Sequence, residues 1–234
     1  MKVLGRDLID EFTCFWSDIR DELDITEADI NSGKHVVFGD QSIESHVGDY
    51  PGWMELPDRD LAYHVAHEVA HQLLRKRGYP RIARGTMYGP ESSEARVGGD
   101  LEELVIHIPL DCLLRGYGMS PKVIVERMFT GTMKGICNSP VPEYGTPWFF
   151  TWAIRYAELS RTLTCAQMEE VDSIFKQRSN DVRSLGKELL EILEGFSDWS
   201  PSITKDAMIA CRDILGLGVD ERVLVVDGRD GSFA

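Results

Sequence analysis

The sequence predicts an α+β fold that is predominantly helical. Over most of the chain, apolar residues recur at spacings of three and four, the pattern of helices with one buried face. Short apolar runs next to glycine or proline, at residues 35–39 and 53–56, predict a small sheet, and residues 223–226 predict a late strand. The chain has 234 residues, of which 43% are hydrophobic, so it can bury a sizeable core without disulfide bonds.

The first half of the chain, residues 1–118, is expected to combine this small sheet with three helices. Residues 7–23 carry one buried face and predict the first helix. A second helix over residues 58–77 should end at Gly78, because glycine readily adopts the left-handed conformation that terminates helices. After a loop, a third helix is expected over residues 90–114, where Gly98-Gly99 and Pro109 strain the pattern.

The second half, residues 119–234, is expected to be a helical C-terminal region. Ser120-Pro121 has the composition of a helix start, and the glycine- and proline-rich residues 131–147 predict a loop. Thr164 and Gln167 have the spacing of a capping box. Further helices are expected over residues 148–163, 165–177, 182–196 and 202–215. The tail after residue 226 is expected to fray.

Charge and composition exclude several classes of protein. Asp and Glu outnumber Lys and Arg by 39 to 25, and the resulting net charge of −14 repels phosphate, so nucleic acid is not an expected partner. The longest dense apolar stretch, residues 148–154, is too short to span a membrane, and acidic residues near the N-terminus argue against a signal peptide. The five cysteines include no CxxC pair, which predicts reduced, mostly buried thiols in a cytoplasmic protein.

The segment that carries chemistry is the HExxH motif formed by His67, Glu68 and His71. Residues four apart lie one turn above each other on one helix face, so the two imidazoles can bind one Zn²⁺ from the same side. Glu68 follows the first ligand and is positioned to act as general base on a zinc-bound water, whose pKa the metal lowers. The motif lies within the second predicted helix, which supports this interpretation.

A catalytic zinc usually has three protein ligands and one open position, so a third ligand must lie elsewhere in the chain. Glu94 falls on the apolar stripe of the third predicted helix, where a carboxylate is costly unless a metal or another group offsets its charge. Glu94 is therefore the preferred third ligand, and Glu103, His107 and Glu91 remain alternatives. The extended motif HExxHxxGxxH is absent, because Arg77 stands where its third histidine would be. The sequence offers Tyr88, His107, Tyr144 and His46 as stabilisers of a reaction oxyanion and does not rank them.

The segment from residue 34 to 118 resembles the ImmA/IrrE-type metallopeptidases, which are gluzincins with a compact zincin core. The matching parts are residues 66–74 around the motif, Glu94-Ala95, and residues 106–109 with Leu113-Leu114. The resemblance implies a zincin-like fold, with His67, His71 and Glu94 as zinc ligands and Glu68 as base. This chain departs from the family pattern at Arg96, where the family commonly has asparagine, and in about one extra helical turn before Pro109.

The expected function is that of a zinc-dependent endopeptidase acting on a specific protein or peptide substrate. In this mechanism, Glu68 takes a proton from the water that attacks the peptide carbonyl and passes the proton to the leaving amine. The alternative is a non-catalytic, zinc-binding regulatory or protein-interaction module, in which a fourth ligand such as His107 closes the site. The sequence does not define the oligomeric state.

Overall fold

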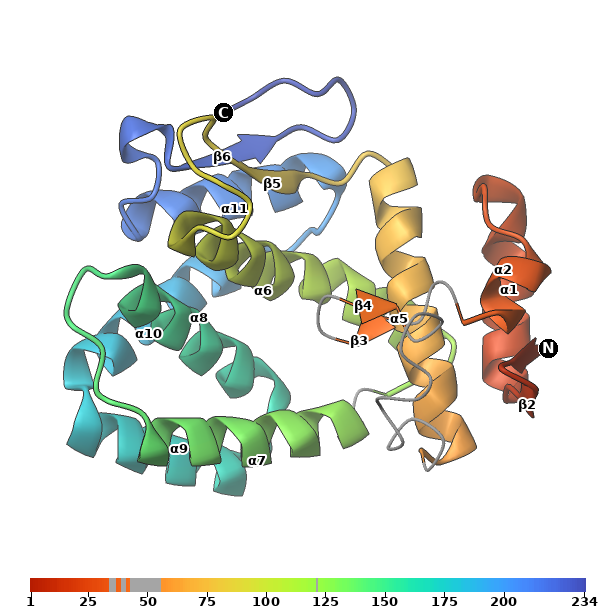
Figure 1. Ribbon diagram of the computed structural model, residues 1–234, viewed down its shortest axis with the longest axis horizontal. Coiled ribbons are helices and arrows are strands. Elements are labelled where there is room, and N and C mark those ends of the chain that lie inside the picture. Colours follow the sequence, from red (N-terminus) through yellow and green to blue (C-terminus); the bar gives the residue numbers. More distant parts are fainter. Residues whose placement is uncertain (34–36, 39–40, 43–55, 121) are drawn as a thin grey trace. The chain divides into compact units, whose positions relative to one another are not determined.

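The computed structural model is mostly helical and contains short antiparallel strand pairs (Figure 1). It describes residues 1–33, 37–38, 41–42, 56–120 and 122–234. The predicted α+β, predominantly helical class is therefore confirmed. The chain forms two compact units, one of residues 1–77 and 109–123 and the other of residues 78–108 and 124–234. The predicted boundary at residue 118 stays a prediction. Among the described residues, no helix is both long and apolar enough to cross a membrane.

The first unit is built around helix α5, Asp58–Lys76, which contains the HExxH motif. Helix α1, Asp10–Ile19, packs against α5 and buries Phe12, Phe15, Trp16 and Ile19. The sequence pattern predicts a longer helix, from residue 7 to residue 23. The observed helix begins later because Arg6–Asp7 forms strand β2, which pairs with β1, Lys2–Val3. It ends earlier because Arg20–Glu22 forms the 3₁₀ turn η1.

The remaining elements of the first unit are short. Helix α2, Glu27–Asn31, begins with a capping box at Thr26. Strands β3, Val37–Phe38, and β4, Gln41–Ser42, form an antiparallel pair. The strand predicted over residues 35–39 is thus confirmed at residues 37–38, and its other residues lie outside the described part of the chain. Of the strand predicted over residues 53–56, residues 53–55 also lie outside the described part, and Leu56 is a bend.

Helix α6, Ser93–Gly116, is continuous through both Gly98-Gly99 and Pro109 and contributes residues to both units. Its apolar stripe is buried as predicted at Val97, Leu101, Leu104, Val105 and Ile108, whereas Cys112 is exposed. Gly98 has a packing role: a Cβ atom there would lie 2.9 Å from Ile82 Cγ2. The glycine that weakens the helical pattern therefore lets α6 approach a neighbouring strand.

The second unit contains one small sheet and a set of packed helices (Figure 1). Strand β5, Arg81–Arg84, pairs antiparallel with β6, Val223–Val226, which follows the 3₁₀ turn η2, Val219–Glu221. Helices α8 and α10 pack closely, because Gly186 lies where a Cβ atom would be 2.6 Å from the Tyr156 ring. The helices of this unit are α7, Lys122–Asn138, α8, Pro147–Thr162, α9, Cys165–Arg178, α10, Asn180–Glu194, and α11, Pro201–Ile214.

The second unit confirms some sequence predictions and corrects others. The capping box of Thr164 and Gln167 is present at the start of α9. The predicted loop over residues 131–147 is wrong up to Asn138, because α7 continues through Gly131 and Gly135. Burial of the apolar positions Val125 and Ile136 outweighs the cost of these glycines, which is about 1 kcal/mol each in a helix.

The structure also tests the predictions for the C-terminal tail and the cysteines, and it contains one strand that the sequence pattern did not predict. The C-terminal tail does not fray as predicted, because Val225 and Ala234 exchange backbone hydrogen bonds of 3.2 and 2.9 Å. All five cysteines are free, as expected, but only Cys211 is buried. Strand β5 was missed in the sequence, because it has only four residues and an arginine at each end.

One carboxylate, that of Asp172 on α9, joins three helices of the second unit. Its oxygen Oδ1 accepts hydrogen bonds of 2.6 Å from Tyr156 on α8 and from Arg183 on α10, and Oδ2 accepts a second bond of 3.0 Å from Arg183. Lys187 Nζ lies 3.6 Å from Oδ1. These hydrogen bonds, led by those from Arg183, lower the pKa of Asp172 to about 2.

We expect Asp172→Asn to lower the free energy of unfolding at pH 7 by about 1–3 kcal/mol, because it removes hydrogen bonds between charged groups. The carboxylate stabilises the fold above its ordinary pKa of 3.8, and this contribution is lost as the pH falls through about 2. Urea unfolding at pH 7, 4 and 3 should therefore show a wild-type advantage that shrinks with acidification. Glu170→Gln, an exposed change on the same helix, is the matched control. An equal loss in both variants would contradict this role for Asp172.

Candidate metal centre

Helix α5 brings the two motif histidines together. The Nε2 atoms of His67 and His71 lie 3.1 Å apart, and their ring centroids are 4.7 Å apart. Both side chains are half-buried, as is Glu68, while Val65, Val69 and Leu73 are buried in the core. The apolar face thus fixes the helix and leaves the motif residues at the edge of the core. Two imidazole nitrogens this close can share one metal ion, as the spacing of four residues predicts.

A buried polar pair lies one turn before the motif. The Tyr63 hydroxyl donates a hydrogen bond of 3.2 Å to Asp111 on the second half of α6, and both residues are buried. The ring centroids of Tyr63 and His67 also lie 5.9 Å apart. Burial, reinforced by the negative charge of Asp111, raises the pKa of Tyr63 well above its ordinary range, so its hydroxyl stays protonated. Tyr63 therefore holds α5 and this part of α6 in a fixed register.

The second unit holds a chain of alternating charges. Glu103 forms an ion pair with His107 Nε2 one turn further along α6. The other ring nitrogen, Nδ1, lies 3.6 Å from Glu158 on α8, and Glu158 accepts a 2.5 Å hydrogen bond from Arg155. Asp100 lies beside these groups and accepts a 2.7 Å hydrogen bond from Thr151. Together with Ile154, these side chains line a cavity of about 200 Å³.

The two carboxylates around His107 control its protonation. Burial by itself would lower the pKa of His107, but hydrogen bonds to Glu103 and Glu158 outweigh burial and raise that pKa to about 10. Glu158 is only 7% exposed. Burial opposes its ionisation, yet the hydrogen bond from His107 and the charge of Arg155 keep the pKa of Glu158 below its ordinary value. In the absence of metal, His107 is therefore an imidazolium held between two carboxylates.

Four of these side chains form a group that could hold a metal ion. Each of them offers one ligand atom, and the four atoms all lie within 4.8 Å of one another. Two are the motif histidines, and the other two come from α6. The group consists of His67, His71, Glu103 and His107. Two or three imidazole nitrogens and a carboxylate oxygen are a donor set that suits zinc and several other transition metals.

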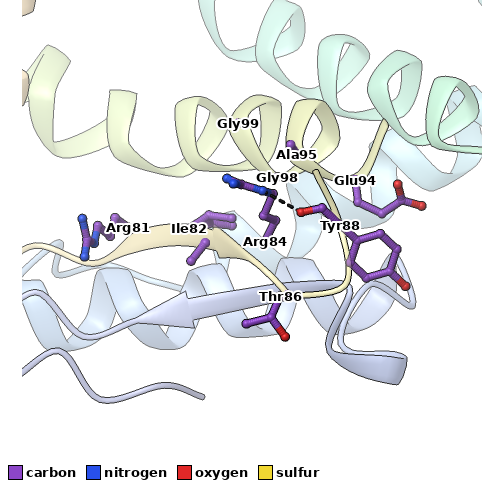
Figure 2. Close-up of a pocket in the computed structure, with 11 residues that line it drawn as sticks. Arg81, Ile82, Arg84, Thr86, Tyr88, Glu94, Ala95, Gly98 and Gly99 are labelled. Atoms are coloured by element: carbon purple, nitrogen blue, oxygen red, sulfur yellow. Dashed lines mark hydrogen bonds between the residues drawn. The ribbon is translucent and has the colours of Figure 1, made fainter. Parts of the chain in front are cut away.

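Glu94, the third ligand preferred from the sequence, is not part of this group and lies among other residues (Figure 2). Its oxygens accept hydrogen bonds of 3.2 Å from Arg222 and 3.1 Å from the Ser93 hydroxyl. Burial raises the pKa of Glu94, but hydrogen bonds from its own backbone N–H, Arg222 and Ser93 outweigh burial and lower it overall. The sequence argument that this carboxylate needs a compensating charge is sound, and Arg222 supplies that charge.

The other candidates from the sequence have separate places. Glu91 is exposed, Tyr144 is 76% exposed, and Tyr88 uses its backbone carbonyl to accept a hydrogen bond from Arg84. His46 lies outside the described residues. Glu103 and His107, which were alternatives for the third ligand, are the ones that share a group with the motif histidines.

Sequence reasoning did not identify Arg155 and Glu158 as neighbours of the candidate ligands. They lie about fifty residues after His107, and no local pattern marks Glu158 apart from its position on the buried face of α8. The sequence pattern weakly indicated that Asp111 lies near the candidate ligands, since it shares a polar edge of α6 with Glu103 and His107.

Comparisons with models of protein families, with curated proteins and with solved structures find no match for this chain. The resemblance to the ImmA/IrrE-type metallopeptidases therefore stays a prediction based on the motif residues.

We expect Glu158→Gln to lower the pKa of His107 and to destabilise the fold by about 1.5–3 kcal/mol, because it removes one of the two carboxylates that compensate the His107 charge. NMR titration of the histidine side chains between pH 6 and 10 in the metal-free protein, together with urea unfolding, measures both effects. Arg155→Gln is the comparison variant. It leaves the contact between Glu158 and His107 in place, so His107 should keep most of its raised pKa. An unchanged His107 titration in Glu158→Gln would contradict this assignment.

Proposed function

We propose that this chain is a zinc-dependent peptidase in which His67, His71 and Glu103 hold the metal and Glu68 is the general base. The observation that carries the proposal is that an intact HExxH motif belongs to a group of side chains able to hold a metal ion. In an HExxH helix, the glutamate after the first histidine is the residue that acts as base. An intact glutamate at this position is what metal-assisted hydrolysis requires.

Helical geometry supports the participation of α6. Tyr63 and Asp111 are hydrogen-bonded, and His67 lies one turn after Tyr63 on α5. On α6, His107 lies one turn before Asp111, and Glu103 lies one further turn back. Residues four apart lie on one helix face, so Glu103 and His107 share the face of α6 that carries Asp111. On α5, Tyr63, His67 and His71 share one face in the same way.

Contacts of Glu94 and Glu103 favour Glu103 as the third ligand. The Glu94 charge is already compensated by Arg222. Glu103 lies in the group with the motif histidines, and its contact with His107 would fix the direction of its carboxylate. Residues that orient a ligand in this way typically change metal affinity by about 10–100-fold when they are replaced.

His107 is better suited to orient Glu103 than to bind the metal. Its two ring nitrogens face Glu103 and Glu158, so both are directed at carboxylates. A ring nitrogen that donates a hydrogen bond to a carboxylate has no lone pair to give to a metal. A site with three protein ligands would therefore keep the open position that hydrolysis needs.

The proposed chemistry assigns defined tasks to the protein side chains. Zinc would polarise the scissile carbonyl and make a neighbouring water more acidic. Glu68 would accept a proton from the attacking water and deliver it to the leaving amine nitrogen. The His107 imidazolium would keep the Glu103 carboxylate ionised and oriented. Tyr63, hydrogen-bonded to Asp111, would limit rotation of the His67 ring through its contact with that ring.

A non-catalytic zinc module is the second candidate. The observation in its favour is that the group has four members, since four protein ligands would close the site. In that case His107 would have to lose its proton and bind the metal directly. Zinc binding would then depend on His107 as strongly as on His67.

We expect Glu103→Gln to lower zinc affinity by at least about tenfold, while Glu94→Gln keeps it near the wild-type value. The two variants make the same chemical change on the same helix, so each serves as the control for the other. Elemental mass spectrometry gives the metal content, and titration against a competing chelator gives the affinity. Loss of zinc in Glu94→Gln alone would return the third-ligand role to Glu94. A chain that binds no zinc after reconstitution would refute the proposal.

We expect Glu68→Gln to retain zinc and to lose peptide hydrolysis by about 10²–10⁴-fold, the range for removal of a general acid–base group. The assay incubates zinc-loaded protein with a mixture of synthetic peptides and identifies new termini by mass spectrometry. His107→Gln distinguishes the two candidate functions, because the peptidase should keep bound zinc with reduced affinity, whereas the closed module should lose it. Zinc binding without any cleavage by the wild type would favour the non-catalytic module.

A further inference from the structure

A groove lies along strand β5, beside the first turns of α6 (Figure 2). Its volume is about 520 Å³, and none of its lining residues belongs to the group of candidate metal ligands. The groove is therefore a second site within the second unit, and its walls are formed by a strand on one side and a helix on the other. Its lining includes Arg81, Ile82, Arg84, Tyr88, Ala95 and Gly99.

The backbone of β5 has one edge turned away from β6. In an antiparallel pair, successive residues alternately direct their backbone N–H and C=O groups toward and away from the partner strand. Gly85 N–H donates to Arg222 C=O at 3.3 Å, so the edge of Ile82 and Arg84 faces away from β6. The hydrogen bond of 2.6 Å from Ile82 N–H to Glu102 confirms this direction.

The outward edge remains available at Arg84. Glu102 satisfies the N–H of Ile82, but among the described residues nothing hydrogen-bonds the backbone N–H or C=O of Arg84. An edge strand with unpaired backbone groups is a template for another extended chain. Recognition by strand addition uses these groups for affinity and the neighbouring side chains for specificity.

Two consecutive glycines of α6 shape the opposite wall. A Cβ atom at Gly98 would crowd Ile82, so this glycine permits close packing of α6 on the sheet. A Cβ atom at Gly99 would meet nothing within 4 Å, and Gly99 lines the groove. The helix therefore packs tightly at one position and leaves open space at the next.

The charge of the groove is opposite to that of the whole chain. Arg81 and Arg84 are exposed, and Arg84 Nε donates a 2.8 Å hydrogen bond to the Tyr88 carbonyl, which fixes its side chain at the groove (Figure 2). The only carboxylate in the lining, Glu94, is paired with Arg222. A chain with a net charge of −14 thus presents a positively charged groove.

We propose that this groove binds an extended, acidic segment of a partner protein, which adds a third strand to the β5–β6 sheet. The backbone of Arg84 would pair with the backbone of the segment, and the guanidinium groups of Arg84 and Arg81 would pair with its Asp or Glu side chains. A second copy of this chain is a poorer occupant of the same edge. Pairing of two β5 strands would bring their arginines together, and like charges on adjacent strands are destabilising.

The experiment measures binding of a fluorescein-labelled heptapeptide with alternating Glu and Val to the full-length chain by fluorescence anisotropy. The comparison peptide has Lys in place of Glu. We expect the Glu peptide to bind at least about tenfold more tightly than the Lys peptide, with affinity that falls as salt increases. Equal affinity for both peptides, or no binding of either at millimolar concentration, would overturn the proposal.

Two variants of Arg84 separate the contributions of its backbone and of its charge to peptide affinity. Arg84→Ala removes the guanidinium group and keeps the N–H, whereas Arg84→Pro also removes the N–H that faces the groove, a change that edge strands tolerate. We expect Arg84→Pro to weaken binding further than Arg84→Ala. Gly99→Phe should also abolish binding by filling the open space, and it tests the site even if Arg84→Pro does not fold. Lys134→Ala, an exposed change on α7, is the control for loss of one positive charge.

Two results would contradict the proposed site. Wild-type affinity in both Arg84→Pro and Gly99→Phe would show that the peptide binds elsewhere. Analytical ultracentrifugation that finds a dimer sensitive to Arg84→Pro would assign the edge to a second copy of the chain instead. Circular dichroism of each variant establishes that the fold is retained.

Discussion

The hydrogen bond between Tyr63 and Asp111 fixes how α5 lies against the second half of α6 in the first unit, and the candidate site depends on this register. Both groups are buried, so each needs the other to replace its lost hydration. Because side chains four residues apart share a helix face, a single fixed pair aligns the turns that follow it on both helices. On α5 the next turn brings His67, whose ring also contacts Tyr63. A local polar contact thereby sets the direction in which the motif is presented.

Compensation of carboxylate charges is a second constraint, and it recurs through the second unit. Asp172 is paired with Arg183, Glu158 with Arg155, and Asp227 is 4% exposed between Lys205 and Arg229. An unpaired charge at the buried Glu158 would cost several kcal/mol, so a cationic side chain must lie beside it. The same requirement explains Glu94, whose charge is compensated by Arg222 from the far end of the sequence. Arg183 and Arg222 come from other elements than their carboxylates, whereas Arg155 lies one turn before Glu158 on the same helix.

The proposed peptidase centre and the proposed groove beside β5 use different recognition chemistry. The first depends on imidazole and carboxylate groups that can hold a metal, and the second on backbone groups of an edge strand flanked by arginines. A peptidase with a specific substrate gains selectivity when a segment remote from the scissile bond also binds, since the second contact raises the effective concentration of the first. The groove would thus supply selectivity that a metal centre alone does not provide.

Much of the fold was determined by the sequence itself. Helix positions follow from apolar spacing, the motif histidines lie on one helix face because of the 3.6-residue period, and the capping box at Thr164 is read from two residues. These features depend on contacts within about one helical turn. Tertiary structure alone decided that Arg222 compensates Glu94, that Glu158 supports His107, and that β5 pairs with β6 some 140 residues later. These pairings depend on which distant residues meet after folding, and a local sequence pattern does not contain that information.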